Sequence, residues 1–297
     1  MKRLALSLLL LSVVVLWGWT FVLVKDAIRA YGLLPFNAIR YVIATAAMGL
    51  FTAWRIDWRS LKVGALIGPV LAAAYLLQTL GLDRTSATST GIITGLFIVF
   101  VPLSSRALFG LRTAGVVWVA IGVSVVGLAL LSGGAPQGMA FGDVLTLAGA
   151  ACFGLHIALL GRYAKGRDAS VLALGQIGAA MAVFLAACPL AAGPLAWPTP
   201  RVWFALLVTG IGATAVAFYV QTFVQQRLPA VQTAMIILLE PLFAALFGYL
   251  LAGDRLNGLQ VLGAALITGS VFVAELYPLL RRARPSPLVQ SSSSSQS

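Results

Sequence analysis

Charged side chains are scarce in this chain of 297 residues. Only 9% of the residues are charged, eight are acidic and one is histidine, whereas 60% are hydrophobic and the mean hydropathy is +0.99. A soluble core does not need so much apolar surface, which excludes an ordinary soluble protein. The 20 basic residues stand singly or in pairs between apolar runs. No continuous basic face is left to follow phosphates, so we expect no nucleic-acid partner.

The chain also lacks the motifs of several enzyme classes. None of its four lysines follows a glycine, so it has no G-x-x-x-x-G-K-[ST] loop, and no ATPase partner is implied. The single histidine, His156, is not spaced from Cys152 or Cys188 as a zinc ligand would be, and we expect no metal and no cofactor. Both cysteines lie in apolar runs, which argues against a disulfide framework. An intramembrane enzyme stays an alternative, because the members of a catalytic triad can be distant in sequence.

Long apolar stretches are what the chain does have. About 20 apolar residues cross the ~30 Å hydrocarbon core as a helix, which satisfies its own backbone hydrogen bonds. The first stretch follows Lys2 and Arg3 as a signal peptide would, but no A-x-A-like cleavage site comes after Trp17-Gly18-Trp19, so we expect a retained helix. In all, the sequence predicts ten transmembrane helices, over residues 4–24, 35–54, 63–82, 87–105, 114–131, 141–161, 170–191, 202–223, 230–251 and 257–279.

Basic residues provide a test of this count, because they collect on the cytoplasmic side of a membrane protein. Fourteen fall on the side of the amino terminus and five on the other side, and Arg40 lies within the second span. A wrong span count would scramble this asymmetry. We therefore expect ten spans with both termini in the cytoplasm.

The two halves of the chain share a weak internal similarity. A shift of 143 residues in the third and fourth spans gives five identities in thirteen positions. At a slightly different offset, Trp17-Gly18 of the first span falls over Phe153-Gly154 of the sixth. Coincidence among helices rich in leucine, alanine and valine is the alternative. Five spans per half is an odd number, so the second copy would enter the membrane from the opposite side, as in alternating-access carriers. The identical positions are Gln78-Thr79, Arg84, Ala87 and Thr90 with Gln221-Thr222, Arg227, Ala230 and Thr233.

The predicted fold class is an all-α integral membrane protein of ten transmembrane helices, arranged as two inverted-topology five-helix repeats around a central cavity. We expect the first repeat over residues 1–131, a connecting loop over 132–140 and the second repeat over 141–280. The basic, serine-rich tail over 281–297 is expected to be disordered.

Motifs near the two ends of the chain resemble a known family. Trp17-Gly18-Trp19-Thr20-Phe21 is similar to the opening of an EamA repeat of the drug/metabolite transporter superfamily, and the run from Glu240-Pro241 to Tyr249 is similar to the close of one. Asp254 stands where that family more often has glutamate. Among its members, the chain most resembles the bacterial YddG-type aromatic amino-acid exporters. The resemblance implies export of metabolites, with neutral and aromatic amino acids preferred.

Charged groups within the spans are the first candidates for a substrate path, because they are costly in lipid. Glu240 lies at the midpoint of the ninth span, before Pro241, and is a candidate to bind a substrate ammonium or to carry a proton. A structural hydrogen bond to a neighbouring helix is the alternative. For Arg40, binding of a substrate carboxylate competes with extension of the side chain to the membrane surface.

Aromatic and amide side chains at helical spacing form the second group of candidates. Aromatic rings stack on flat apolar groups, and an amide bonds both a carboxylate and an amine. Tryptophan and tyrosine can instead be interface anchors, and for His156 a helix-packing hydrogen bond competes with a proton relay. The predicted substrate-binding residues are Trp17, Thr20, Phe21, Tyr75, Gln78, Thr79, Thr94, His156, Phe218, Gln221 and Glu240.

Together these features predict a secondary transporter of small organic metabolites in a bacterial-type inner membrane, whose partners are its solute and the lipid bilayer. A drug or nucleotide-sugar carrier of the same superfamily is the main alternative, although an anionic nucleotide would favour a more basic cavity. A receptor is a further alternative, and it would bind a ligand without carrying it across the membrane.

Overall fold

The structure, a computed structural model, describes residues 3–85, 87–132, 141–191, 197–251 and 255–282, and these residues form helices and no strands. Much of the predicted connecting loop (133–140), Asp254 and nearly all of the predicted tail (283–297) lie outside the described residues. The helices are α1 Arg3–Tyr31, α2 Leu33–Thr52, α3 Trp58–Arg84, α4 Ala87–Gly95, α5 Phe97–Phe109, α6 Gly115–Leu131, α7 Phe141–Tyr163, α8 Ala169–Ala187, the 3-10 turn Cys188–Leu190, α9 Pro200–Leu207, the π-helical segment Val208–Val216 (η2), α10 Ala217–Gln225, α11 Ala230–Ile237, α12 Glu240–Leu251 and α13 Gly258–Arg282.

Within the described residues, ten apolar segments cross the bundle, which confirms the predicted all-helical membrane fold. Eight segments are at least 18 residues long and apolar enough to span a bilayer, and Gly115–Leu131 and Gly258–Ala274 are shorter apolar helices. The spans lie where they were predicted, but several are longer than expected. The first helix, for example, continues to Tyr31.

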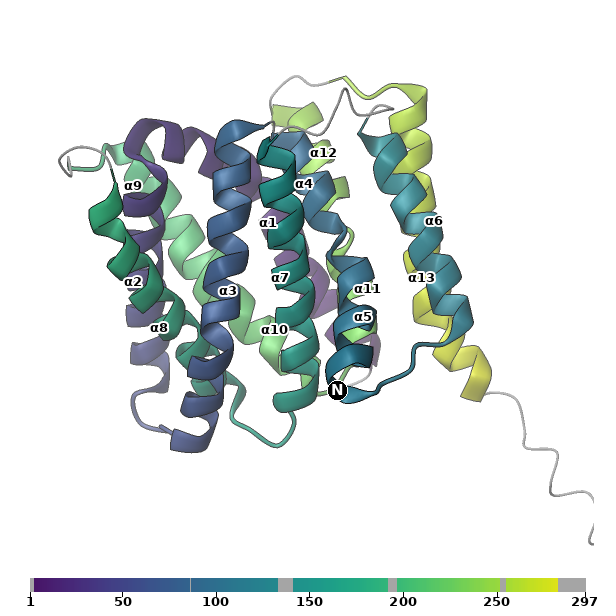
Figure 1. Cartoon of the computed structure of the whole chain (residues 1–297), viewed down its shortest axis with the longest axis horizontal. Helices are drawn as coiled ribbons and strands as arrows, with labels where there is room; N and C mark the ends of the chain where they lie inside the picture. The colour runs from purple at the N-terminus through teal and green to yellow at the C-terminus, as the bar shows by residue number, and fades with distance from the viewer. Residues whose placement is uncertain (1–2, 86, 133–140, 192–196, 252–254, 283–297) are drawn as a thin grey trace, which may run out of the picture.

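Two of the spans are broken near the middle. The fourth consists of α4 and α5, which meet at Leu96, and the ninth consists of α11 and α12, which meet at Leu238 and Leu239. At both breaks a backbone hydrogen bond spans three residues, as in a 3-10 helix, instead of four. The Leu96 N–H donates to the Ile93 carbonyl, and the Leu239 N–H donates to the Ile236 carbonyl. In Figure 1, α4 and α12 lie toward one end of the bundle, and α5 and α11 toward the other.

The eighth span contains a different irregularity. Between α9 and α10 the backbone widens into the π-helical segment η2 over Val208–Val216. Such wide turns are rare and are often found at functional sites, because they displace carbonyl groups from the regular helical ladder. η2 packs against α1 and α2 of the first half of the chain.

Helices of the two halves pack against each other throughout the bundle. α3 lies between α7 and α8, α1 contacts α12, α5 contacts α7, and α6 pairs with α13 at one edge (Figure 1). Small residues allow the closest of these contacts. A Cβ atom on Gly64 of α3 would lie 2.2 Å from the Leu172 carbonyl oxygen of α8, so this glycine serves tight helix packing.

Candidate substrate-binding site

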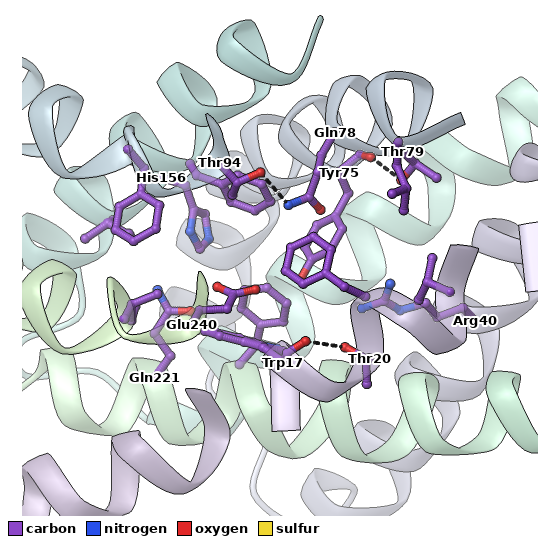
Figure 2. Close-up of a pocket in the computed structure, with 18 residues that line it drawn as sticks. Trp17, Thr20, Arg40, Tyr75, Gln78, Thr79, Thr94, His156, Gln221 and Glu240 are labelled. Atoms are coloured by element: carbon purple, nitrogen blue, oxygen red, sulfur yellow. Dashed lines mark hydrogen bonds between the residues drawn. The ribbon is translucent and has the colours of Figure 1, made fainter. Parts of the chain in front are cut away.

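One cavity in the middle of the bundle is lined by every predicted substrate-binding residue and by Arg40 (Figure 2). The space free of protein atoms between the lining residues is about 720 Å³, a figure that includes open solvent, and the centre of a water molecule can occupy about 60 Å³ of it. The broken ninth span contributes two of the lining residues, Ile237 and Glu240, on either side of its break. Helices from both halves of the chain therefore meet at this cavity.

The sequence analysis missed six lining residues. Of these, Phe153 had a signal in the sequence, because the internal similarity pairs it with Trp17. The other five are apolar residues in a chain that is 60% hydrophobic, so nothing in the sequence distinguishes them. The missed residues are Val24, Leu82, Phe97, Phe153, Ile157 and Ile237.

Arg40 reaches the cavity from α2 and is only 4% exposed. Its Nε donates a hydrogen bond of 2.8 Å to the Thr214 hydroxyl in η2, and its guanidinium lies 4.9 Å from the centre of the Tyr75 ring. No carboxylate of the described residues is within ion-pair distance of it. The alternative in which Arg40 extends to the membrane surface is therefore wrong.

Glu240 lines the same cavity from the first turn of α12. Within the described part of the chain, its carboxyl group has no hydrogen bond and no ion pair. The structure thus does not contain the helix-to-helix hydrogen bond that was the alternative explanation for this residue. Arg40 and Glu240 line one cavity without forming an ion pair.

Aromatic rings fill much of the wall between these charged groups. The centre of the Phe218 ring lies 5.7 Å from the ring centre of Trp17 and 6.0 Å from that of Tyr75. Tyr75 also packs edge-on against Phe153, with the two ring centres 5.1 Å apart. The Trp17 indole N–H donates to the Ala213 carbonyl at 2.8 Å. Trp17 and Tyr75 are both buried, so they are not interface anchors.

Two amide side chains add polar groups to the wall. Gln78 Nε2 donates to the Thr94 hydroxyl at 3.0 Å, and Gln221 Nε2 donates to Gln225 Oε1 at 3.0 Å. The Gln221 carbonyl oxygen is buried and has no hydrogen-bond partner. An acceptor without a partner in a buried wall is costly unless a ligand or water supplies a donor.

The remaining polar lining residues make bonds within the bundle. The hydroxyls of Thr20 and Thr79 donate to carbonyls of their own helices. His156 Nε2 lies 2.7 Å from Gln176 Oε1, so the helix-packing hydrogen bond that was one of the alternatives for this residue is present. Among the described residues, no group of three or more His, Cys, Asp or Glu side chains could hold a metal ion.

Comparisons with known proteins agree with this architecture. The model of the EamA-like transporter family matches residues 4–133 and again 140–276. An uncharacterized transporter of Archaeoglobus fulgidus is 33% identical, with 93% of this chain and 87% of the relative covered. The uncharacterized inner membrane transporter YedA of Escherichia coli K12 is 22% identical over 96% of each chain. One crystal structure shares the fold with a TM-score of 0.73 at 21% identity, covering 95% of this chain and 99% of that one.

The matching models, the ten apolar segments and the buried cavity between the halves support one assignment. The chain is a multi-pass membrane transporter that belongs to the EamA-like transporter family.

Proposed function

We propose that this transporter is a secondary carrier of small zwitterionic metabolites, chiefly neutral and aromatic amino acids, and that the central cavity is their binding site. The observation that carries the proposal is that Arg40 and Glu240, one basic and one acidic residue, line one cavity without an ion pair between them. Figure 2 shows Arg40 and Glu240 on either side of the Trp17 and Tyr75 side chains.

A zwitterionic amino acid has the two groups that these residues would bind. Its carboxylate suits the guanidinium of Arg40, and its ammonium suits Glu240 and the free carbonyl oxygen of Gln221. A flat apolar side chain would stack on the aromatic wall. An anionic nucleotide fits less well, because Arg40 is the single arginine or lysine among the residues that line the cavity.

Alternating access is the transport mechanism that this arrangement supports. We infer that the halves are inverted repeats and that their rocking opens the cavity to each side in turn. Broken helices at corresponding positions of two such halves are typical of carrier binding sites, and α4–α5 and α11–α12 have this form. We further propose that the protein lies in an inner membrane with both termini in the cytoplasm and that net flux is outward.

Counterflow in proteoliposomes tests the proposal. Vesicles that contain the purified protein and unlabelled phenylalanine should transiently accumulate labelled phenylalanine above the equilibrium level. Arg40→Gln and Glu240→Gln should each lower the rate about tenfold or more, since a hydrogen bond to a charged group contributes about 1.5–3 kcal/mol. The matched controls Arg29→Gln and Asp83→Asn change residues that do not line the cavity and should keep most of the flux.

Two outcomes would contradict the proposal. If the wild-type protein shows no counterflow of any neutral amino acid, the substrate class is wrong. If both cavity variants transport as fast as the wild type, the charged residues do not bind the solute.

A further inference from the structure

The direction of the Arg40 side chain is set by a residue that lies 174 positions away in the sequence. Arg40 comes from α2, and its Nε donates to Thr214 in the π-helical segment η2 of the other half. Both residues are buried, Arg40 with 4% and Thr214 with 0% of its surface exposed. A long, flexible arginine side chain without such a partner would have several directions to choose from.

The π turn is what gives the Thr214 hydroxyl its orientation. In a regular helix a threonine hydroxyl bonds a carbonyl three or four residues earlier, as Thr209 does with the Ala205 carbonyl at 2.7 Å. Thr214 instead donates to the carbonyl of Thr209, five residues earlier, at 2.7 Å. Its only hydrogen is thereby used, and a lone pair of its oxygen is left to accept from Arg40.

The surrounding contacts hold η2 and α2 together. Gly210 permits a close approach, because a Cβ atom there would lie 2.9 Å from Ile43 Cγ2 and 3.1 Å from the Arg40 carbonyl oxygen. The carbonyl of the neighbouring Ala213 accepts the Trp17 indole N–H. Two consecutive residues of η2 therefore hold a cation and an aromatic ring of the cavity.

We infer that Thr214 is a positioning residue for substrate specificity: it holds the guanidinium of Arg40 where the substrate carboxylate binds, and so favours solutes with a carboxylate over those without one. This inference rests on the proposed function. The hydrogen bond to Thr214 uses Nε and neither terminal nitrogen of the guanidinium. The terminal nitrogens lie beside Tyr75 at the cavity, where a substrate carboxylate would contact them.

The test compares two competitors of labelled phenylalanine counterflow, unlabelled phenylalanine and phenethylamine, which lacks the carboxylate. Thr214→Val should weaken competition by phenylalanine about tenfold and change competition by phenethylamine less than about twofold, because the variant removes one hydrogen bond to a charged group. Thr214→Ser keeps the hydroxyl and should stay within about threefold of the wild type. The matched control is Thr209→Val, an equally buried threonine of the same segment whose hydroxyl does not contact Arg40.

The possible results separate this inference from the proposed function. Absence of phenylalanine counterflow in the wild type would overturn both. Counterflow with the same preference for phenylalanine in Thr214→Val as in the wild type would overturn the inference alone. An equal loss for both competitors in Thr214→Val, or the same loss of preference in Thr209→Val, would show a general structural role and would also overturn it. If Thr214→Val does not fold, Thr214→Ala replaces it with the same expectations.

Discussion

At the scale of single residues, Gln221 illustrates how a hydrogen-bond chain fixes the polarity of a cavity wall. Gln225 Nε2 donates to the Ile157 carbonyl at 2.9 Å, so its own carbonyl oxygen faces Gln221. Gln221 must then present its NH₂ group to Gln225, and its Oε1 is left without a partner. The orientation of both side-chain amides thus follows from the Ile157 backbone carbonyl, at which this series of hydrogen bonds ends. The wall therefore offers an acceptor to a solute that brings a donor.

Replacing this residue tests whether it receives the substrate ammonium. Gln221→Met keeps the approximate volume and removes the acceptor, so phenylalanine should compete for transport about tenfold more weakly, by loss of a hydrogen bond to a charged group. Competition by 3-phenylpropionate, which has no ammonium, should be unchanged. If competition by both compounds weakened equally, Gln221 would not be a binding partner of the ammonium.

Sequence reasoning at this scale selected polar and aromatic residues that line one cavity, and it left the direction of the Arg40 side chain open. Helical spacing and the internal similarity selected residues that do line one cavity, because polar groups within a span have few places to go. The position of Arg40 in its span left two directions open. The partner that decides between them, Thr214, belongs to the other half of the chain and has no sequence signal of its own.

At the scale of helices, the predicted spans were confirmed but their internal breaks were not visible beforehand. Leu96, Leu238 and Leu239 are apolar residues that fit a continuous helix as well as a broken one. Pro241 indicated an irregularity, yet it did not fix where α11 ends. The π turn of η2 depends on packing against α1 and α2, which the sequence of the eighth span alone does not contain.

The crossing of α3 and α8 depends on glycine. Gly64→Ala would place a Cβ atom 2.2 Å from a backbone carbonyl oxygen of α8, so the helices must separate, and overpacking of this kind costs about 1–3 kcal/mol. The matched control is Gly122→Ala on α6, where a Cβ atom meets nothing within 4 Å. Thermal unfolding of the detergent-solubilised proteins should show a lower melting temperature for Gly64→Ala only. If the two variants are equally stable, the crossing is not tightly packed.

The start of α8 should give the fold a measurable pH dependence. Burial raises the pKa of the Asp168 carboxyl, but hydrogen bonds from the Ser170 hydroxyl and from the backbone N–H groups of Val171 and Ser170 outweigh burial, and the net pKa is lowered. A lowered pKa in the folded state means that the carboxylate stabilises the protein above the unfolded-state pKa of about 3.9. This stabilisation is lost as the pH falls through the still lower pKa of the folded state.

Asp168→Asn isolates this contribution, because asparagine is also a good N-cap but does not titrate. The stability difference between the wild type and Asp168→Asn should shrink as the pH falls from about 5 toward 3. Asp168→Ala should lose about 1 kcal/mol at pH 7 by removal of the cap. Melting curves in a pH series measure both effects. A difference that stays constant with pH would contradict the assignment of the carboxylate as the stabilising form.

At the scale of the whole molecule, two glycines suggest how the halves engage each other. A Cβ atom on Gly18 of α1 would lie 2.6 Å from Phe243 Cβ of α12, and one on Gly154 of α7 would lie 2.5 Å from Phe100 Cβ of α5. The internal similarity of the sequence pairs Gly18 with Gly154, and each glycine contacts the broken span of the opposite half. Hydropathy and the distribution of basic residues were enough to predict ten spans. They carry no information on these contacts, because contacts between distant segments depend on the packed bundle.

The central claim is that one cavity binds both charged groups of a zwitterionic solute, and a competition measurement on the wild-type carrier tests it most directly. Counterflow of labelled phenylalanine would be competed with unlabelled phenylalanine, with phenethylamine and with 3-phenylpropionate. We predict that each analogue competes about tenfold more weakly than phenylalanine or worse, because each lacks one charged group that the cavity binds. If either analogue competes as well as phenylalanine, the group it lacks is not recognised and the claim is contradicted.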